Sequence, residues 1–184
     1  MAGAQKGAQA QGQSLFFIDE SGFYPRPSVV RTYAPVGQTP ILKEWWTRDQ
    51  LSAISAISPE GKLYVHGQEW AINSAAVVAF LEHLRREVPG RMVLIWDGAP
   101  MHRSHLIKAF LVNGAAQRLH VERLPAYAPE LNPSAGLWAH LKAGELRNVC
   151  GFTIRHLRHE RRDAVKRAWR KPRFLKGCFR CAKL

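Results

Sequence analysis

The chain has 184 residues, 46% of them hydrophobic and six of them Trp, which predicts one domain with a buried core and excludes a disordered polypeptide. No run approaches about 18 uninterrupted apolar residues, so no membrane span is predicted, and three cysteines fit a reducing cytoplasm better than secretion. The net charge of +13 is concentrated in residues 142–184, which carry 14 Lys and Arg against three Asp and Glu. Such a segment predicts a polyanionic partner, nucleic acid above all, and the alternative is a solvated basic helix.

Residues 1–14 are mostly small and polar, and we expect a flexible lead-in with no signal peptide. The stretch that follows predicts strands, because short apolar runs and apolar–polar alternation lie between turn residues. These strands are expected over 15–23, where the apolar run ends at Asp19 and leads into a Ser21–Gly22 turn, over 29–35 and 39–45 as a hairpin, and over 51–58 and 62–67.

From Asn73 onward the apolar spacing changes, and helices are predicted to alternate with strands. The expected elements are, in chain order, a helix over 73–88, a central apolar strand over 92–96, a helix capped by Ser104 and ending at Asn113–Gly114, a strand over 119–124, a helix beginning at Asn132–Pro133 and a basic helix over about 153–170. This order predicts an α/β domain with an antiparallel meander followed by parallel strands joined by helices.

Three positions in this layout are candidates for a common site. Asp19 and Asp97 each follow an apolar strand, and residue 135 lies in the first turn of the helix that Pro133 opens. Strand ends and helix N-termini meet at one edge of such a sheet, so the three can converge. Three carboxylates there would hold two divalent ions about 3.5–4 Å apart, as phosphoryl transfer requires. The third position, however, is Ala135, and a lone strand-end Asp can also be a turn or cap residue.

Four segments resemble the DDE transposases of the mariner superfamily, and specifically its bacterial insertion-sequence branch. They are LFFIDESGF (15–23), RTYAPVGQTP (31–40), VLIWDGAPMHRS (93–104) and LPAYAPELNPSAGLWAHLK (124–142). The resemblance implies an RNase H-like fold, with a mixed sheet and helices on both faces. It also implies a catalytic domain over 15–150, followed by a basic C-terminal helix and tail over 151–184.

The activity that this resemblance implies is cleavage and transfer of DNA strands at transposon ends with Mg²⁺ or Mn²⁺. By position, Asp19 and Asp97 match the first two metal ligands, whereas Ala135 stands where the family has Glu. Glu20, Glu130 and Glu145 are unconvincing substitutes by position. We therefore expect a two-ion site whose second ion is weakly bound, and a transposase inactivated at this step.

The residues around the site leave its history and its present role open. The change to Ala135 fits either a decayed genomic copy or a deliberate or recent Glu→Ala change, and the intact surroundings favour the second. The alternative function is a non-catalytic, transposase-derived protein that binds DNA or poisons active subunits. A related nuclease of the same fold, acting on a structured nucleic acid, is a third interpretation.

Basic side chains and one histidine near the site and in the C-terminal segment are candidate DNA contacts. They are His102, Arg103, Lys142, Arg147, Arg155, Arg158, Arg161, Arg162, Lys166 and Arg167. Trp45, Trp46, Trp138 and Trp169 could stack on bases, although core packing is favoured for most of them. A zinc site formed by Cys178 and Cys181 with Cys150, His156 and His159 is disfavoured, because the spacing matches no strong signature.

The expected partner is double-stranded DNA, as transposon ends and target, with a homodimer on paired ends as the arrangement implied by the resemblance. No helix-turn-helix pair precedes residue 15, so an N-terminal DNA-reading domain is expected to be separate or missing. The chain would then be a fragment or the second reading frame of a split gene. The expected location is the bacterial cytoplasm, at the nucleoid, with no membrane partner.

Overall fold

The computed structural model describes residues 11–25, 33–38, 50–125, 128–147 and 153–182. A mixed five-stranded sheet forms its centre, with the strand order β3-β2-β1-β4-β5. The strands are β1 (Ser14–Phe23), β2 (Leu51–Ile57), β3 (Leu63–Gln68), β4 (Met92–Trp96) and β5 (Leu119–Arg123). The β1–β2 and β2–β3 pairs are antiparallel and the β1–β4 and β4–β5 pairs are parallel, which confirms the predicted meander and parallel strands.

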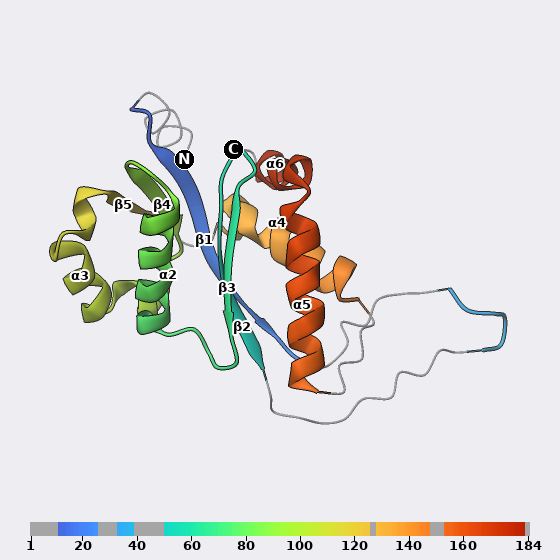
Figure 1. Cartoon of the computed structure of the whole chain (residues 1–184). Coiled ribbons are helices and arrows are strands. Elements are labelled where there is room, and N and C mark those ends of the chain that lie inside the picture. The colour runs from blue at the N-terminus through green and yellow to red at the C-terminus, as the bar shows by residue number, and fades with distance from the viewer. Residues whose placement is uncertain (1–10, 26–32, 39–49, 126–127, 148–152, 183–184) are drawn as a thin grey trace.

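Helices cover both faces of this sheet (Figure 1). On one face lie α2 (Ser74–Glu87) and α3 (His105–Val112), and on the other lie α4 (Pro133–Ala139), α5 (Ile154–Trp169) and α6 (Pro172–Cys181). Shorter turns are the 3-10 helices η1 (Pro100–Arg103), η2 (Ala115–Gln117) and η3 (Pro129–Leu131) and the π-helical η4 (His140–Glu145). The predicted caps form, with side-chain acceptors at Asn73 for Ala76 N–H, Ser104 for Ile107 N–H and Asn132 for Ser134 N–H.

The alternation of β1 side chains divides the hydrophobic core into two halves. Phe16 and Ile18 face the α2–α3 layer, where they pack with residues such as Leu81. Leu15 and Phe17 face the opposite layer of α4, α5 and α6. All five residues of β4 are buried, which confirms the prediction of a central apolar strand there.

The C-terminal segment, expected as a basic helix and tail over 151–184, packs into this core over its described residues. Apolar residues recur at helical spacing on α5, and α6 was not predicted at all. Leu175, Cys178 and Phe179 of α6 are buried beside Phe17 of the sheet, and the Phe17 and Phe179 rings meet edge to face at 5.4 Å. Residues 153–182 therefore belong to the same folded unit as the strands, because they bury an apolar face against it.

Strand β1 also continues past the point where the sequence predicts its apolar run to end. Its parallel pairing with β4 stops at Phe17–Ile95, whereas its antiparallel pairing with β2 continues to Phe23–Leu51. The partner strand keeps this stretch extended and prevents the predicted turn. Asp19 thus lies inside β1 but beyond the last residue paired with β4, with the space next to it open on that side.

Two remaining observations concern regions outside this sheet. Most of the hairpin predicted over 29–45 lies outside the described residues, where only a turn at 35–38 is described, closed by the Gln38 N–H donating to the Pro35 carbonyl (3.0 Å). Within the described ranges, no helix combines the length and the apolar character needed to cross a membrane.

Candidate active site

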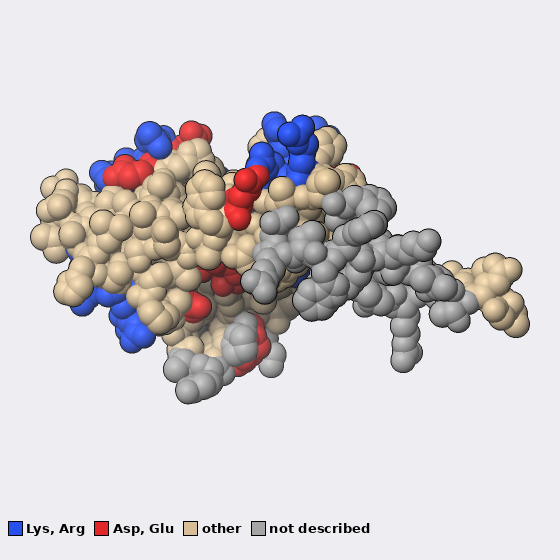
Figure 2. All heavy atoms as spheres, turned by 90° about the horizontal axis from the view of Figure 1, so that it is seen from below, with Lys and Arg blue, Asp and Glu red and all other residues tan. Residues whose placement is uncertain are grey.

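A cavity of about 670 Å³ opens where β1 and β4 separate and α4 begins, and we call it the carboxylate cavity. It is lined by Asp19, Asp97, Gly98, Arg103, Arg123, Leu124, Pro125, Ala128, Asn132 and Ala135. Figure 2 views the molecule from below and shows acidic side chains around a hollow near the middle of this face, with basic groups toward its edges. The three positions expected to converge therefore line one cavity.

Asp19 is held in a defined orientation by the helix that begins at this cavity. The Trp138 indole N–H donates to Asp19 Oδ2 at 3.1 Å, and Trp138 itself is buried. Burial, and then the negative charges of Glu20 and Asp97, raise the pKa of Asp19 to about 7. Such a cluster of carboxylates is costly without a cation, so its electrostatics favour binding of a positive ion.

Asp97 directly follows β4 and is fixed by its own loop. The Ala99 N–H donates to Asp97 Oδ1 at 2.9 Å, and His102 Nδ1 lies 2.9 Å from the same oxygen. The other ring nitrogen of His102 lies 3.0 Å from Glu20 Oε1, and the imidazole stacks on Trp96 with 4.4 Å between ring centroids. Asp97 therefore has a defined position although half of its side chain is exposed.

His102, one of the expected DNA contacts, is buried behind Asp97. Only 4% of this residue is exposed, because it is enclosed by Trp96, Glu20 and Asp97. Burial alone would lower the pKa of His102, but the hydrogen bond and charge of Glu20, with the contribution of Asp97, raise it above its usual value. His102 orients Asp97 and does not face the solvent.

Ala135 lies in the first turn of α4, on the wall of the carboxylate cavity and exposed to solvent. Trp138 is one turn further along the same helix face, and its indole reaches Asp19. The Ser134 hydroxyl donates to the Phe17 carbonyl at 3.4 Å, which ties the start of α4 to β1. A carboxylate at position 135 would consequently point toward Asp19.

None of the acidic residues that the structure describes takes the place of that carboxylate. Glu20 is turned to His102, on the opposite side of β1, and Glu145 binds Arg167 and Lys171 at 2.6 and 3.1 Å. Glu130 is exposed and does not line the cavity. Among the described residues, no group of three His, Cys, Asp or Glu side chains could hold a metal ion. The two aspartates suit one hard divalent cation.

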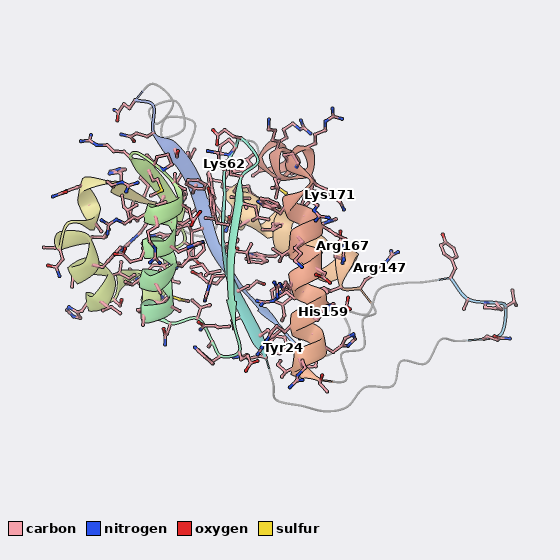
Figure 3. The ribbon with its side chains drawn as sticks, in the orientation of Figure 1. Tyr24, Lys62, Arg147, His159, Arg167 and Lys171 are labelled. Atoms are coloured by element: carbon pink, nitrogen blue, oxygen red, sulfur yellow. The ribbon has the colours of Figure 1, made fainter. Side chains whose placement is uncertain are left out.

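The predicted DNA contacts occupy several different environments. Arg103 lines the carboxylate cavity, and the ammonium of Lys142 lies 5.5 Å from the centroid of the Phe23 ring. Within the described ranges, Arg147, Arg155 and Arg162 are exposed and form no ion pair, whereas Arg158 pairs with Glu69, Lys166 with Asp163 and Arg167 with Glu145. Figure 3 shows Arg167 and Lys171 toward the upper end of α5 and Arg147 beside it.

Arg161, another of the expected DNA contacts, points inward. It is 9% exposed, and its Nη1 donates to the Ser52 carbonyl at 3.2 Å. The helical pattern predicts this orientation in retrospect, since Leu157, Ala164 and Ala168 lie on the same buried face of α5. The position of a basic residue on an apolar helix face indicates that its side chain points inward, which composition alone does not show.

Arg123 lines the cavity and was missed by the sequence analysis. Arg123 is the last residue of β5, and Asp97 is the first residue after the neighbouring strand β4. Because the ends of parallel strands meet at one edge of the sheet, this position in the sequence could have identified Arg123. One residue of the disfavoured zinc site, Cys150, lies outside the described residues. Of the rest, Cys178 is buried and Cys181 exposed, and His156 and His159 lie next to acidic residues of α5.

Comparison with solved structures identifies the fold. The chain matches one in the "Crystal structure of the Mos1 mariner paired end complex with Mn" with a TM-score of 0.64 and 17% identity, over 97% of this chain and 58% of that one. For the catalytic domain of Mos1 mariner transposase, the TM-score is 0.58 and the identity 15%, over 97% of this chain and 87% of that one. The chain also matches one in the simian T-cell lymphotropic virus intasome in complex with PP2A regulatory subunit B56 gamma. The TM-score is 0.55 and the identity 8%, over 86% of this chain and 48% of that one.

These identities are low, so the likeness concerns the fold: a mixed five-stranded sheet with helices, as in RNase H-like transposase and integrase catalytic domains. The chain spans less than two thirds of the length of the chain in the Mos1 paired-end complex. No curated protein sequence matches it. Residues 14–149, most of the chain, match the sequence profile described as DDE superfamily endonuclease. The chain belongs to the DDE superfamily endonuclease family.

Proposed function

We propose that this chain is the catalytic domain of a mariner-type transposase of the bacterial insertion-sequence branch, inactivated by Ala135. Its ancestral reaction would be metal-dependent cleavage and transfer of DNA strands at transposon ends. The observation that carries the proposal is the carboxylate cavity, which Asp19, Asp97 and Ala135 line together. The first two residues have the side chains that the reaction needs, and the third does not.

In this proposal Asp19 and Asp97 would hold Mg²⁺ or Mn²⁺, which supplies activation of the attacking oxygen and stabilisation of the leaving oxygen. Trp138 keeps the Asp19 carboxylate directed into the cavity, and the Ala99 N–H and His102 do the same for Asp97. Orientation of this kind lowers the reorganisation needed when substrate binds.

The basic side chains around the site would bind the phosphates of the substrate. Arg103 and Arg123 line the cavity itself, where their guanidinium groups can bind phosphate oxygens in a bidentate manner. The basic residues further away would contact the backbone of double-stranded DNA: the half-buried Lys142 and the exposed Arg147, Arg155, Arg158, Arg162, Lys166 and Arg167. Related structures are described as paired-end and strand-transfer complexes, which supports DNA ends as substrate and a homodimer as the working form.

Ala135 removes a ligand without disturbing the scaffold that would position it. Its methyl group offers no oxygen to a second ion, while the Asn132 cap and the Trp138 contact remain in place. Binding of DNA should consequently persist while cleavage is lost.

The test compares the parent chain with Ala135→Glu and Ala135→Gln, using DNA that carries the ends of the element with Mg²⁺ or Mn²⁺. Glutamate should restore metal-dependent strand cleavage, whereas glutamine, with the same size and no charge, should leave it at background. Equal cleavage by the parent and Ala135→Glu would contradict inactivation at this position. Absence of cleavage in Ala135→Glu would contradict the claim that residue 135 alone disables the chain.

Ala135 itself favours a second candidate function, that of a non-catalytic protein that binds ends or poisons active subunits. Titration of the parent into a fixed amount of a cleaving Ala135→Glu variant distinguishes the two. Inhibition at equimolar parent supports mixed, inactive assemblies. Undiminished cleavage at a large excess of parent rules out poisoning.

A further inference from the structure

A second cavity, of about 400 Å³, lies between the end of the edge strand β3 and the first half of α5, and we call it the Arg161 pocket. It is lined by Leu51, His66, Gly67, Gln68, Glu69, Trp70, Arg158 and Arg161. Strand pairing places it at the same end of the sheet as the carboxylate cavity, because Leu51 pairs with Phe23 at the end of β1. Tyr24 marks this end in Figure 3. The pocket has no part in the proposed cleavage reaction.

The main feature of this pocket is the buried guanidinium of Arg161, which has unpaired hydrogen-bond donors. Arg161 donates from Nη1 to the Ser52 carbonyl, and its buried Nε has no hydrogen-bond partner. Within the described ranges no carboxylate pairs with it. Burial and the positive charge of Arg158 lower its pKa. A Cβ at Gly67 would overlap the guanidinium, so this strand gives the group the space it occupies.

Arg118 shows what a purely structural arginine looks like in the same protein. Its Nε, Nη1 and Nη2 donate to the carbonyls of Gly90, Arg85 and Val88, at 2.9, 3.0 and 2.5 Å. These bonds occupy the guanidinium with backbone acceptors near the end of α2. Arg161 makes one such bond, and a buried guanidinium with unpaired donors is costly. The difference indicates that the acceptor for Arg161 is a ligand.

The other groups around the pocket define that ligand. Arg158 contributes a second guanidinium, shared at present with Glu69, and the two side chains are 52% and 40% exposed. Trp70 is 64% exposed, so much of a large aromatic side chain is open to solvent next to two cationic groups. Guanidinium pairs bind phosphate, and an exposed indole stacks on a nucleobase.

We propose that the Arg161 pocket binds a single unpaired nucleotide of a DNA strand, with its phosphate on Arg161 and Arg158 and its base on Trp70. The base must be unstacked from a duplex to lie on the indole, so the occupant is a single-stranded flank or end. The size of the pocket suits one nucleotide. The inference rests on the proposed function in taking DNA as the source of the phosphate.

The experiment measures binding of labelled DNA by fluorescence anisotropy, with EDTA present so that no cleavage occurs. One DNA is a blunt duplex, and the other is the same duplex with a short single-stranded overhang. We expect Trp70→Ala to bind the overhang DNA about tenfold more weakly and the blunt duplex unchanged. Glu69→Gln should bind the overhang DNA a few-fold more tightly, because Glu69 no longer competes with phosphate for Arg158.

Two further variants separate charge from geometry. Arg161→Lys keeps the positive charge but loses the planar fork, and it should weaken overhang binding about tenfold. Arg86→Ala removes an exposed charge from α2, on the opposite face of the sheet, and is the control for general electrostatics. If Arg161→Lys unfolds the protein, the exposed positions Trp70 and Glu69 still decide the matter. Equal affinity of the parent, Trp70→Ala and Glu69→Gln for the overhang DNA would overturn the proposal.

Competition distinguishes the source of the phosphate. Excess unlabelled overhang DNA should displace the labelled DNA, whereas inorganic phosphate or a free deoxynucleoside monophosphate should do so only at far higher concentration. Displacement by the monophosphate at equal nucleotide concentration would instead assign the pocket to a free nucleotide and overturn a DNA strand as ligand. Failure of Ala135→Glu to cleave DNA would weaken the proposed function and leave these binding results unaffected.

Discussion

The two sides of the carboxylate cavity are built to different degrees of completeness. On the β4 side, Asp97 is held by a backbone N–H and by His102, which is itself fixed by Glu20 and Trp96. On the α4 side, Asn132 caps the helix and the Trp138 indole donates to Asp19, but the residue on the cavity wall between them is Ala135, which has no carboxylate. Under the proposed function, the supporting structure is therefore present on a side of the cavity that lacks the third ligand.

This difference separates what the fold needs from what the chemistry needs. The contacts that position α4 are made by buried or capping groups, which contribute to stability whether or not residue 135 is acidic. A carboxylate at the cavity wall would add charge repulsion to a site in which burial and neighbouring carboxylates already raise the pKa of Asp19 to about 7. Loss of the third carboxylate is thus compatible with a fully folded protein.

The largest effect is expected on the intact side of the cavity. In an Ala135→Glu background, Asp97→Asn should reduce metal-dependent cleavage by more than about 100-fold, because loss of a direct ligand exceeds the effect of losing a supporting residue. The measurement is the initial rate of strand cleavage, with folding checked by circular dichroism. An Asp97→Asn variant that cleaves within a few-fold of its background would show that this side is not catalytic.

The next effect concerns stability and pH at Asp19. Its pKa is raised to about 7 from 3.8, so the folded protein carries a penalty that grows as pH rises from about 4 and is complete above about 7. Asp19→Asn removes the charge and should be more stable than the parent by on the order of 3 kcal/mol at pH 8.

That advantage should disappear at about pH 3, below the ordinary pKa of 3.8, where Asp19 is protonated in both the folded and unfolded states. Urea unfolding in EDTA at the two pH values measures the difference. A variant no more stable than the parent at pH 8 would mean that the clustered charge costs nothing.

A smaller effect is expected for the residues that support Asp97. His102→Ala should lower the affinity for Mn²⁺ about 10–100-fold, because Asp97 loses the group that orients it. His102→Gln retains a hydrogen-bonding side chain and should recover part of the loss. Titration of bound Mn²⁺ by electron paramagnetic resonance makes the comparison, and identical affinities for parent and His102→Ala would remove His102 from the site.

The smallest effect is expected at Glu145, the last residue of η4, which directly follows α4. Hydrogen bonds from Arg167 and Lys171 outweigh burial and lower the pKa of Glu145. Glu145→Gln should destabilise the protein by about 1 kcal/mol at pH 7. The stabilisation from a lowered acidic pKa is complete above the ordinary value of 4.5 and is lost as pH falls through the lowered pKa, so this difference should vanish in strong acid. A difference that is constant with pH would assign the effect to packing.

Much of the architecture could be predicted from the sequence because its determinants are local. The apolar run 92–96 and the caps Asn73, Ser104 and Asn132 depend on neighbouring residues, and the strand order follows from how they alternate with helices. Asp97 could be identified for the same reason. The amphipathic spacing of α6 was also present in the sequence, but the abundance of basic residues obscured it.

The remaining features depend on residues far apart in the chain. Strand β1 continues past Asp19 because β2 pairs with it, although Ser21 and Gly22 favour a turn. His102 is buried because Glu20, 82 residues earlier, accepts its hydrogen bond. The helical pattern of α5 places Arg161 on the buried face, but the space that its guanidinium fills there depends on Gly67, which has no side chain. Such long-range partners have no signal in a single sequence.

The number of Mn²⁺ ions bound in the carboxylate cavity tests the central claim most directly. We predict that the parent and Ala135→Gln bind one ion at concentrations at which Ala135→Glu binds two, with the second ion lost again on Asp19→Asn. Equal stoichiometry and affinity in the parent and Ala135→Glu would contradict the account of position 135 as the missing ligand.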